Sequence, residues 1–294
     1  MNLLCDLALF YCSAIWGSTF FIVKDTLSML HPVSMVAYRF LLAALLLLPF
    51  AIAKRGLFKY LRESFILTIF LVLLYVSQTW GLKYTTASNS GFITGLFVVF
   101  VPLFSALLFK KPVSKTHWFS SAMAVAGLWV LTGGIKGFNL GDGLTLIAAA
   151  TYALHVLFMD SYAKARLDIT VLTFQQFWMT GVICLAAALG WNFPLGTAEV
   201  PHALGVLTFL AVFPTLSGFY LQMWAQQFVP PVRAALIFAL EPVFAAIFAW
   251  TLGGEKITAS GALGGGIIVS ALIFSELSGY IAYARKKKLK IRPE

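Results

Sequence analysis

The sequence predicts an all-α integral membrane protein of ten transmembrane helices, arranged as two inverted five-helix repeats around a central cavity. Three observations support this prediction. First, 60% of the 294 residues are hydrophobic and only 11% are charged, whereas a soluble domain carries about 25% charged residues. Second, ten apolar runs are long enough to cross a bilayer. Third, the two halves of the chain resemble each other in sequence.

The apolar runs define the expected helices, because a bilayer-spanning helix needs roughly 20 apolar residues. They lie at about 3–23, 33–53, 64–82, 91–109, 117–134, 142–160, 169–190, 203–223, 232–252 and 259–281. The connections between them are short and leave no room for a soluble domain. The first run has no basic leader and no convincing small-residue cleavage site, so it is expected to stay as a helix rather than to be removed as a signal peptide.

The basic residues indicate how these helices cross the membrane. With a cytoplasmic N-terminus, the outer loops hold only Lys24, Lys83, Lys136 and Lys256. The inner loops and the C-terminal tail hold 16 basic residues: Lys54, Arg55, Lys59, Arg62, Lys110, Lys111, Lys115, Lys164, Arg166, Arg233, Arg285, Lys286, Lys287, Lys288, Lys290 and Arg292. Positive charge concentrates on the cytoplasmic side of membrane proteins, so both termini are predicted to be cytoplasmic. The net charge of +10 then indicates topology and contact with anionic membrane lipids, not a nucleic-acid partner.

An internal repeat divides the chain. Residues 89–109 and 229–249 align without gaps at an offset of 140, and an offset of 136 places Trp16 on Tyr152 and Arg39 on Gln175. The predicted domains are therefore a first repeat over 1–135 and a second over 141–284, followed by a basic cytoplasmic tail over 285–294. Because five is odd, the second repeat must enter the membrane inverted. In secondary transporters of this plan the solute site lies near the midplane, between the repeats.

Several segments resemble a known family. The stretches "AIWGSTFFIVKD", "HPVSMVAYRFLLAALLLLP" and "ALEPVFAAIFAWTLGGEKIT" are similar to the EamA-type branch of the drug/metabolite transporter superfamily, and the resemblance covers nearly the whole chain. The most specific match is Leu240-Glu241-Pro242 followed by Gly254-Glu255. The first repeat departs from the family pattern, because "FKKPVSK" stands where a Gly-Glu pair often closes the fourth helix. The resemblance implies a central cavity and export of amino acids, their relatives or drugs across a bacterial inner membrane.

Two ionisable residues near the middle of their spans are the candidates for proton coupling. A charge inside the bilayer costs about 2.5 kcal/mol or more, so such residues are functional candidates by default. Glu241 lies near the centre of the ninth span, and Pro242 after it predicts a kink with a free carbonyl at Phe238. A purely structural Glu241 that donates one hydrogen bond to a neighbouring helix is the alternative. For His155, three hypotheses stay open: a core residue, a solute ligand or a proton carrier.

The candidate solute-binding residues are polar or aromatic side chains inside the spans. They are Trp16, Arg39, Tyr75, Gln78, Tyr152, His155, Gln175 and Gln222. Arg39 can instead extend its side chain to the headgroups, and each glutamine can instead join two helices. The pairs Gly91/Gly95 and Gly261/Gly265 predict close helix contacts, either within one chain or across a homodimer.

No cofactor and no metal site are expected. The chain has no GxxxxGK[ST] loop for ATP and no Cys/His cluster. Cys5, Cys12 and Cys184 form no CxxC pair and lie in apolar spans. The leading hypothesis is therefore a secondary transporter, not an enzyme, that exports small solutes by alternating access. Uptake by exchange is the first alternative, and a membrane-embedded enzyme or scaffold is the second.

The topology can be tested with reporter fusions. Fusions after Lys24, Arg62, Lys136 and Arg292 should report outside, inside, outside and inside, because the positive charge stays on the cytoplasmic side. Paired alkaline phosphatase and fluorescent protein fusions at each site give opposite signals and control for expression. An external C-terminus would contradict the predicted inverted repeat.

Overall fold

The computed structural model describes residues 2–54, 56–110, 115–134, 137–196, 200–229 and 237–290. In these ranges the secondary structure is helical, without strands. The elements are α1 (Asn2–Thr26), α2 (Pro32–Ile52), α3 (Leu61–Gly81), α4 (Ala87–Gly95), α5 (Phe97–Phe109), α6 (Lys115–Thr132), α7 (Leu140–Lys164), α8 (Ile169–Gly190), α9 (Val200–Leu210), the π-helix η1 (Ala211–Ser217), α10 (Gly218–Gln226), α12 (Glu241–Thr251) and α13 (Ala259–Lys290).

The described helices fall on the ten predicted spans. Seven helical segments are long and apolar enough to cross a membrane, and two shorter apolar helices cover 118–132 and 259–275. The remaining span, the ninth, contains α12, and its first part lies outside the described residues. Arg55, Lys111, Lys136, Arg233 and Arg292 of the predicted charge pattern also lie outside them.

Polar side chains cap the first turns of α7 and α8. Asp168 accepts a hydrogen bond from the Thr170 N–H at 2.9 Å at the start of α8. Asn139 and Asp142 form a capping box at the start of α7, in which each side chain accepts from the backbone N–H of the other at 3.0 and 3.1 Å. These caps satisfy amide groups that have no partner inside the helix.

Three of the spans are irregular. The fourth breaks at Leu96 between α4 and α5. The eighth passes through η1, which contains Pro214. In the ninth, the sequence predicts a kinked helix with Glu241 at its centre, but Glu241 is the first residue of α12. Ile237 and Phe238 before it are helical and Ala239 and Leu240 form a turn, so the described part of the span is interrupted just before Glu241. Pro242, which has no N–H to donate, lies in the first turn of α12, where proline is favoured.

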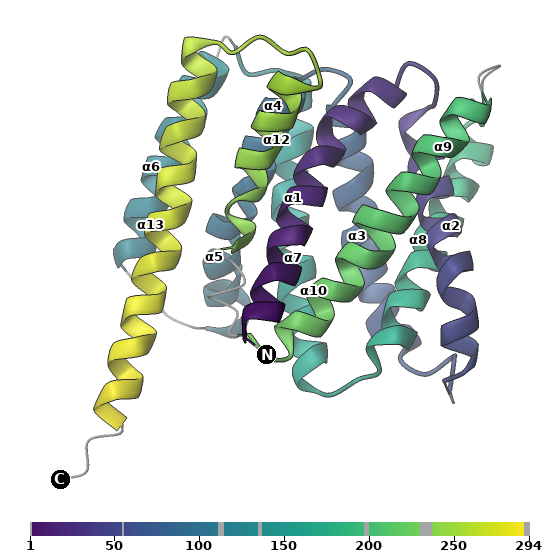
Figure 1. Ribbon diagram of the computed structural model, residues 1–294, viewed down its shortest axis with the longest axis horizontal. Coiled ribbons are helices and arrows are strands. Elements are labelled where there is room, and N and C mark those ends of the chain that lie inside the picture. The colour runs from purple at the N-terminus through teal and green to yellow at the C-terminus, as the bar shows by residue number, and fades with distance from the viewer. Residues whose placement is uncertain are drawn as a thin grey trace.

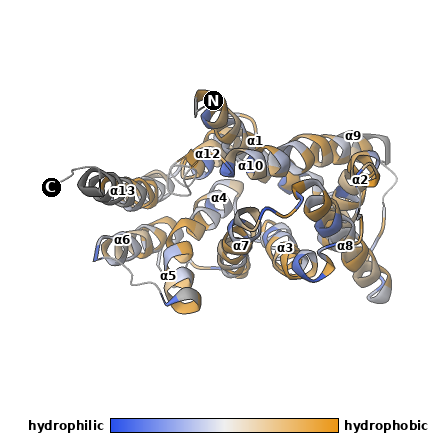
Figure 2. Cartoon of the chain, turned by 90° about the horizontal axis from the view of Figure 1, so that it is seen from below, coloured by the Kyte–Doolittle hydropathy of each residue, from blue (hydrophilic) through white to orange (hydrophobic). Residues whose placement is uncertain are grey.

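The helices form two layers (Figure 2). One layer holds α12, α1, α10 and α9, and the other holds α5, α7 and α3. The pair α6 and α13 lies at one end of the layers, and the pair α2 and α8 lies at the other (Figures 1 and 2). The start of α1 and the end of α13 lie on the same side of the bundle (Figure 1).

The first helices of the two halves run in opposite directions. Lys24, near the end of α1, donates a hydrogen bond to the carbonyl of Thr85. The hydroxyl of Thr85 in turn donates to Asp142, near the start of α7. The end of α1 and the start of α7 therefore lie at the same end of the bundle, at the top of Figure 1. Following the predicted topology, we call it the outer end.

Glycines allow α12 to pack closely against α1 and α4. A Cβ added to Gly91 of α4 would lie 2.3 Å from the Cβ of Ala245, and one added to Gly95 would lie 3.0 Å from the ring of Pro242. A Cβ added to Gly17 of α1 would lie 2.8 Å from the backbone nitrogen of Ala245. Real Cβ atoms do not approach as closely as those added at Gly17 and Gly91, so these two positions require glycine, whereas at Gly95 a neighbouring side chain would have to shift by a few tenths of an ångström.

The second GxxxG pair also lies in a region of close packing. A Cβ on Gly264 would lie 2.4 Å from the backbone of Leu131 in α6, and one on Gly265 would lie 2.3 Å from the ring of Phe92. A Cβ added to Gly261 would meet only the side chain of Thr258, three residues earlier in the chain. The close contacts of Gly91, Gly95 and Gly265 are thus made inside one chain.

Gly91→Ala should lower the thermal stability of the purified protein in detergent, because the added methyl group forces α4 and α12 apart. Overpacking of this kind costs about 1–3 kcal/mol. Gly266→Ala is the matched control, since nothing lies within 4 Å of its added Cβ. There the higher helix propensity of alanine should leave the melting temperature unchanged or raise it. Equal melting temperatures for the two variants would contradict the close contact.

Candidate functional site

A small cavity of about 30 Å³ lies between the two layers. Six elements contribute to its wall: α1, α3, α4, α7, α10 and α12. The lining residues are Trp16, Thr19, Phe20, Leu74, Tyr75, Gln78, Thr94, Tyr152, Phe219 and Glu241. The structure thus brings together five residues that the sequence singles out, and we call this space the central cavity.

Glu241 supplies the acidic group of the central cavity. Its side chain is 5% exposed, and its Oε2 atom has no hydrogen-bond partner among the described residues. The close packing around Gly17 and Gly91 holds this end of α12 against α1 and α4. A buried carboxylate without a partner is strongly unfavourable. The unpartnered Oε2 therefore favours a proton, or a cationic group brought to it, over a bare charge.

Trp16 connects the cavity wall to the π-helix. Its indole Nε1–H donates to the carbonyl of Pro214 at 2.7 Å, and its ring lies 5.8 Å from Phe219 and 5.4 Å from Phe238 between centroids. The π-helix η1 has wider turns than an α-helix, and π-helical segments occur often at functional sites. The contact places the indole between α1 and η1, where it forms part of the aromatic wall.

Arg39 lies behind the wall and does not line the cavity. The side chain is 4% exposed, so it does not extend to the membrane surface as one sequence hypothesis allows. Its Nε donates to the hydroxyl of Thr215 in η1 at 2.6 Å, and its Cζ lies 4.7 Å from the ring centroid of Tyr75. This distance is in the range of a cation–π contact. Arg39 therefore packs on the ring of Tyr75 without lining the cavity itself.

Gln78 faces the cavity, whereas His155 does not line it. The amide nitrogen of Gln78 donates to the hydroxyl of Thr94 at 3.1 Å. His155 is buried outside the cavity wall. Its Nε2 lies 2.9 Å from Oε1 of Gln176, and its ring contacts Phe219 edge-on. The hydrogen bond to Gln176 is consistent with a packed core residue, one of the three hypotheses for His155.

Gln175 and Gln222 also lie away from the cavity wall. Gln175 accepts a hydrogen bond from Ser64 at 2.6 Å and donates to the carbonyls of Leu57 and Lys59 at 2.6 and 2.7 Å. These contacts join α8 to the α2–α3 connection at the inner end. Gln222 is buried in α10, and its Oε1 has no hydrogen-bond partner among the described residues. The sequence does not distinguish these glutamines from Gln78, because all three are polar residues on apolar helices.

Five further lining residues are missed by the sequence interpretation: Thr19, Phe20, Leu74, Thr94 and Phe219. Hydroxyl and phenyl side chains are common in membrane helices and carry no signal by themselves. Thr94 is the exception, because it lies beside the Gly91/Gly95 pair on a helix already expected to have close neighbours.

The central cavity is too small for an organic solute in this conformation. Its volume of about 30 Å³ is far below the roughly 300–1,000 Å³ of small-molecule pockets. The helices around it must separate before a solute can enter. Among the described residues, no group of three or more His, Cys, Asp or Glu side chains is placed to hold a metal ion.

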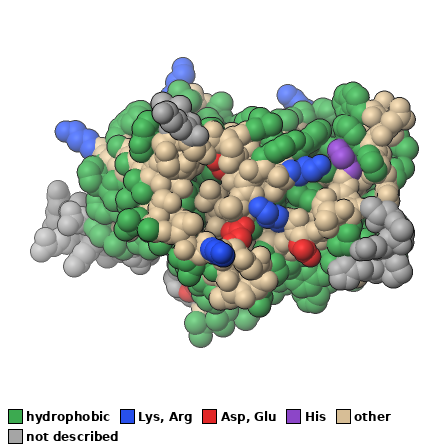
Figure 3. Space-filling view, turned by 90° about the horizontal axis from the view of Figure 1, so that it is seen from above, with side chains coloured by type: hydrophobic (Ala, Val, Ile, Leu, Met, Phe, Trp, Pro, Cys, Tyr) green, Lys and Arg blue, Asp and Glu red, His purple; other side chains and the backbone are tan. Residues whose placement is uncertain are grey.

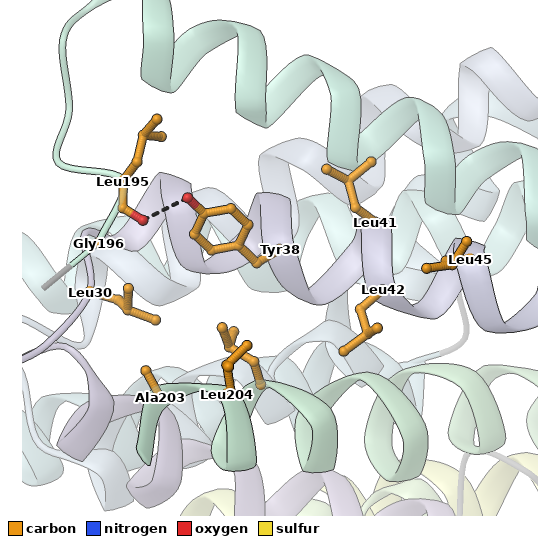
Figure 4. A pocket seen from close by; sticks show the side chains of 10 residues that line it. Leu30, Tyr38, Leu41, Leu42, Leu45, Leu195, Gly196, Ala203 and Leu204 are labelled. Atoms are coloured by element: carbon orange, nitrogen blue, oxygen red, sulfur yellow. Dashed lines mark hydrogen bonds between the residues drawn. The ribbon is translucent and has the colours of Figure 1, made fainter. Parts of the chain in front are cut away.

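A larger pocket of about 410 Å³ lies elsewhere, between α2 and α9 (Figure 4). Leucines form most of its wall, and the hydroxyl of Tyr38 is turned aside to donate to the carbonyl of Leu195 at 2.6 Å. Solute sites usually combine apolar walls with a few convergent polar groups. This pocket lacks such groups and suits a lipid acyl chain better than a polar solute.

Comparison with known proteins identifies similar chains over the full length. The EamA-like transporter family matches at residues 3–133 and 139–277. An uncharacterized transporter of Archaeoglobus fulgidus is 33% identical over 277 residues, which cover 94% of this chain and 87% of that protein. The uncharacterized inner membrane transporter YedA of Escherichia coli is 27% identical, over 95% of this chain and 92% of its own. One solved crystal structure has the same fold with a TM-score of 0.70 at 17% identity, covering 93% of this chain and 96% of that one.

Gln175→Leu should destabilise the protein and leave solute selectivity unchanged, because it leaves one hydroxyl and two carbonyl groups without their partner. The Ser64 hydroxyl is buried, and a buried group without a partner costs about 1–3 kcal/mol, whereas the carbonyls of Leu57 and Lys59, in the half-buried to exposed α2–α3 connection, can bond to water instead. Thermal unfolding in detergent and solute-induced shifts of the melting temperature measure the two effects. Gln78→Leu is the matched comparison, in which the solute-induced shift should change. A selectivity change in Gln175→Leu without a stability loss would place Gln175 on the solute path.

Proposed function

Because the chain belongs to the EamA-like transporter family, within the drug/metabolite transporter superfamily, we propose that it is a secondary transporter that exports small organic solutes from the cytoplasm. Amino acids, related metabolites and drugs are the proposed solutes, and the inner membrane is the proposed location, with both termini cytoplasmic. The observation that carries the proposal is the buried Oε2 of Glu241, which has no hydrogen-bond partner among the described residues, in a small aromatic cavity lined by both halves of the chain.

The proposed mechanism is alternating access by the two repeats, 1–135 and 141–284. The opposite directions of α1 and α7 support inverted repeats, as do paired contacts. Arg39 of α2 bonds to Thr215 in the eighth span, and its repeat counterpart Gln175 of α8 bonds to Ser64 in the third span. In each half, the second span is thus bound to the third span of the other half. Two nearly equivalent arrangements of the same halves are what opening to either side requires.

Within this mechanism the cavity residues have separate roles. Trp16, Tyr75 and Tyr152 supply an aromatic wall for the apolar part of a solute, and Gln78 offers a polar contact. Arg39 positions Tyr75, and Gln175 stabilises the inner end. Glu241 exchanges a proton or a cationic group when the cavity opens to water, because water then stabilises the charged carboxylate that the closed cavity does not.

His155 and Gln222 are assigned less direct roles. His155 is the rival site for proton transfer. Its role is less direct because its ring contacts Phe219, which lines the cavity, and does not line the cavity itself. Gln222 becomes a solute ligand when a rearrangement of α10 turns its unpaired Oε1 toward the cavity. Export and exchange-driven uptake use the same cavity, so flux measurements decide the direction.

The proposal is tested by solute flux into and out of liposomes that contain only the purified protein. A broad screen of amino acids, metabolites and drugs identifies solutes that move, with protein-free liposomes as the control. A pH gradient imposed across the liposomes should drive uphill movement of a transported solute if protons are exchanged. Absence of flux for every solute, from folded protein, would sink the proposal.

Glu241→Gln should abolish uphill, pH-dependent transport while downhill exchange of the same solute persists. The amide keeps the shape of the carboxyl group and its hydrogen-bonding capacity but cannot release a proton. Uphill flux under a pH gradient and counterflow without a gradient measure the two activities in the same liposomes.

Glu63→Gln is the matched control, because Glu63 lies in the first turn of α3 and does not line the central cavity. Its uphill flux should equal that of the unmodified protein. Undiminished uphill transport by Glu241→Gln would assign Glu241 to packing, and the same pair of measurements on His155→Gln then tests the rival site.

A further inference from the structure

The connection between α3 and α4, together with the first turn of α4, receives polar contacts from three other parts of the chain at the outer end. Lys24 of α1 donates to the carbonyl of Thr85. The hydroxyl of Thr85 donates to Asp142 of α7. The third contact comes from Glu255, which follows α12 and binds the first turn of α4. Charged side chains gather near the middle of this face, with hydrophobic groups around them (Figure 3).

Glu255 caps α4 from the opposite half of the chain. Its Oε1 accepts a hydrogen bond from the N–H of Ala87, and its Oε2 accepts from the N–H of Ser88 at 3.1 Å and from the Ser88 hydroxyl at 2.6 Å. A carboxylate at a helix N-terminus is favoured by the free N–H groups and by the helix dipole.

The backbone around Glu255 aims the carboxylate at α4. Gly254 adopts a positive φ of 68°, which turns the chain sharply after α12. The N–H of Glu255 donates to the carbonyl of Ala249 at 3.0 Å, so the turn folds back on the end of α12. A movement of α12 or of its connection to α13 therefore carries the carboxylate with it.

This contact forms part of the wall of a second cavity at the outer end. The second cavity has a volume of about 590 Å³, and Lys24, Ala87 and Glu255 are among its lining residues. The central cavity reaches Thr94, seven residues further along the fourth span, or about 10 Å at 1.5 Å per residue. On α1, four residues separate Phe20 of the central cavity from Lys24 of the outer one, or about 6 Å. The same helices, α1 and α4, thus border both spaces, beside α12.

We propose that Glu255 and Ser88 form the outer gate of the transporter, which closes the route between α1, α4 and α12. The proposal rests on the proposed transport function and adds the residues that control opening to the outside. When the gate opens, the carboxylate leaves α4 and remains in the outer cavity beside Lys24, where water replaces the lost hydrogen bonds. The Thr85–Asp142 contact is buried, at 4% and 0% exposure, and stays closed because water cannot replace it.

The gate is tested by the accessibility of the central cavity, without any solute. Thr94→Cys is introduced after Cys5, Cys12 and Cys184 are replaced by alanine, and a membrane-impermeant maleimide is added to either face of oriented vesicles. Labelling of Lys256→Cys identifies the face that carries the gate. From that face, Glu255→Ala should raise the labelling rate at position 94 about tenfold, the size expected for loss of a charge-assisted contact at a helix N-terminus.

Two milder variants and one control complete the test. Ser88→Ala removes one of the three hydrogen bonds and should raise the rate about threefold. Glu255→Gln should fall between the two other gate variants, because an amide accepts hydrogen bonds but carries no charge. Lys256→Ala removes the neighbouring charge, whose side chain is exposed, and should leave the rate unchanged.

Each outcome has one meaning. Unchanged labelling in folded Ser88→Ala and Glu255→Gln would overturn the gate, even if Glu255→Ala fails to fold. An equal increase in Lys256→Ala would also overturn it, because it would indicate general loosening of the outer end. If labelling rises as expected but liposomes show no flux of any solute, the gate stands and the proposed transport function fails.

Discussion

The arrangement of the central cavity depends on how closely three helices meet at the start of α12. Glycine at positions 17 and 91 lets the backbones of α1 and α4 approach α12 to distances that no other residue permits. In hydrocarbon, where apolar burial drives helix association only weakly, close packing of small residues is the main source of attraction. The packing also determines where Glu241 lies, because its helix begins at the point of contact. A looser junction would leave the carboxyl group free to reach another partner.

The interruption of the ninth span has a second consequence. A continuous helix would satisfy its own backbone groups and would present Glu241 as one side chain among many on its surface. A helix that starts at Glu241 instead directs its N-terminal end toward the cavity, as in the discontinuous helices of other transporters. Pro242 makes this start favourable because it needs no hydrogen-bond acceptor. The fourth span is also interrupted, at Leu96.

Contacts between the halves differ in how easily water replaces them. Gln175 at the inner end is fully buried and satisfies three groups at once, and Arg39 is equally enclosed beside Thr215 and Tyr75. Breaking either contact would leave buried polar groups without partners, which is costly. Glu255 is only half-buried. A transporter must populate two conformations of similar free energy, so the contacts that break during transport are expected where water can take their place. The buried contacts are then expected to stay intact during the conformational change.

The sequence by itself determined the membrane class, the ten spans, the two-repeat relation and the presence of a carboxyl group in the ninth span. These follow from local properties: the length of apolar runs, the distribution of lysine and arginine, and the cost of a charge in hydrocarbon. Only the tertiary structure decided which polar residues meet. Trp16, Tyr75, Gln78 and Tyr152 reach one cavity with Glu241, whereas Gln175 and His155 bind other helices. A helix sequence shows which residues share a face, but the partner of that face depends on packing across the whole bundle. For the same reason the contact of Glu255 with α4 joins residues more than 160 positions apart and has no signal in either segment alone.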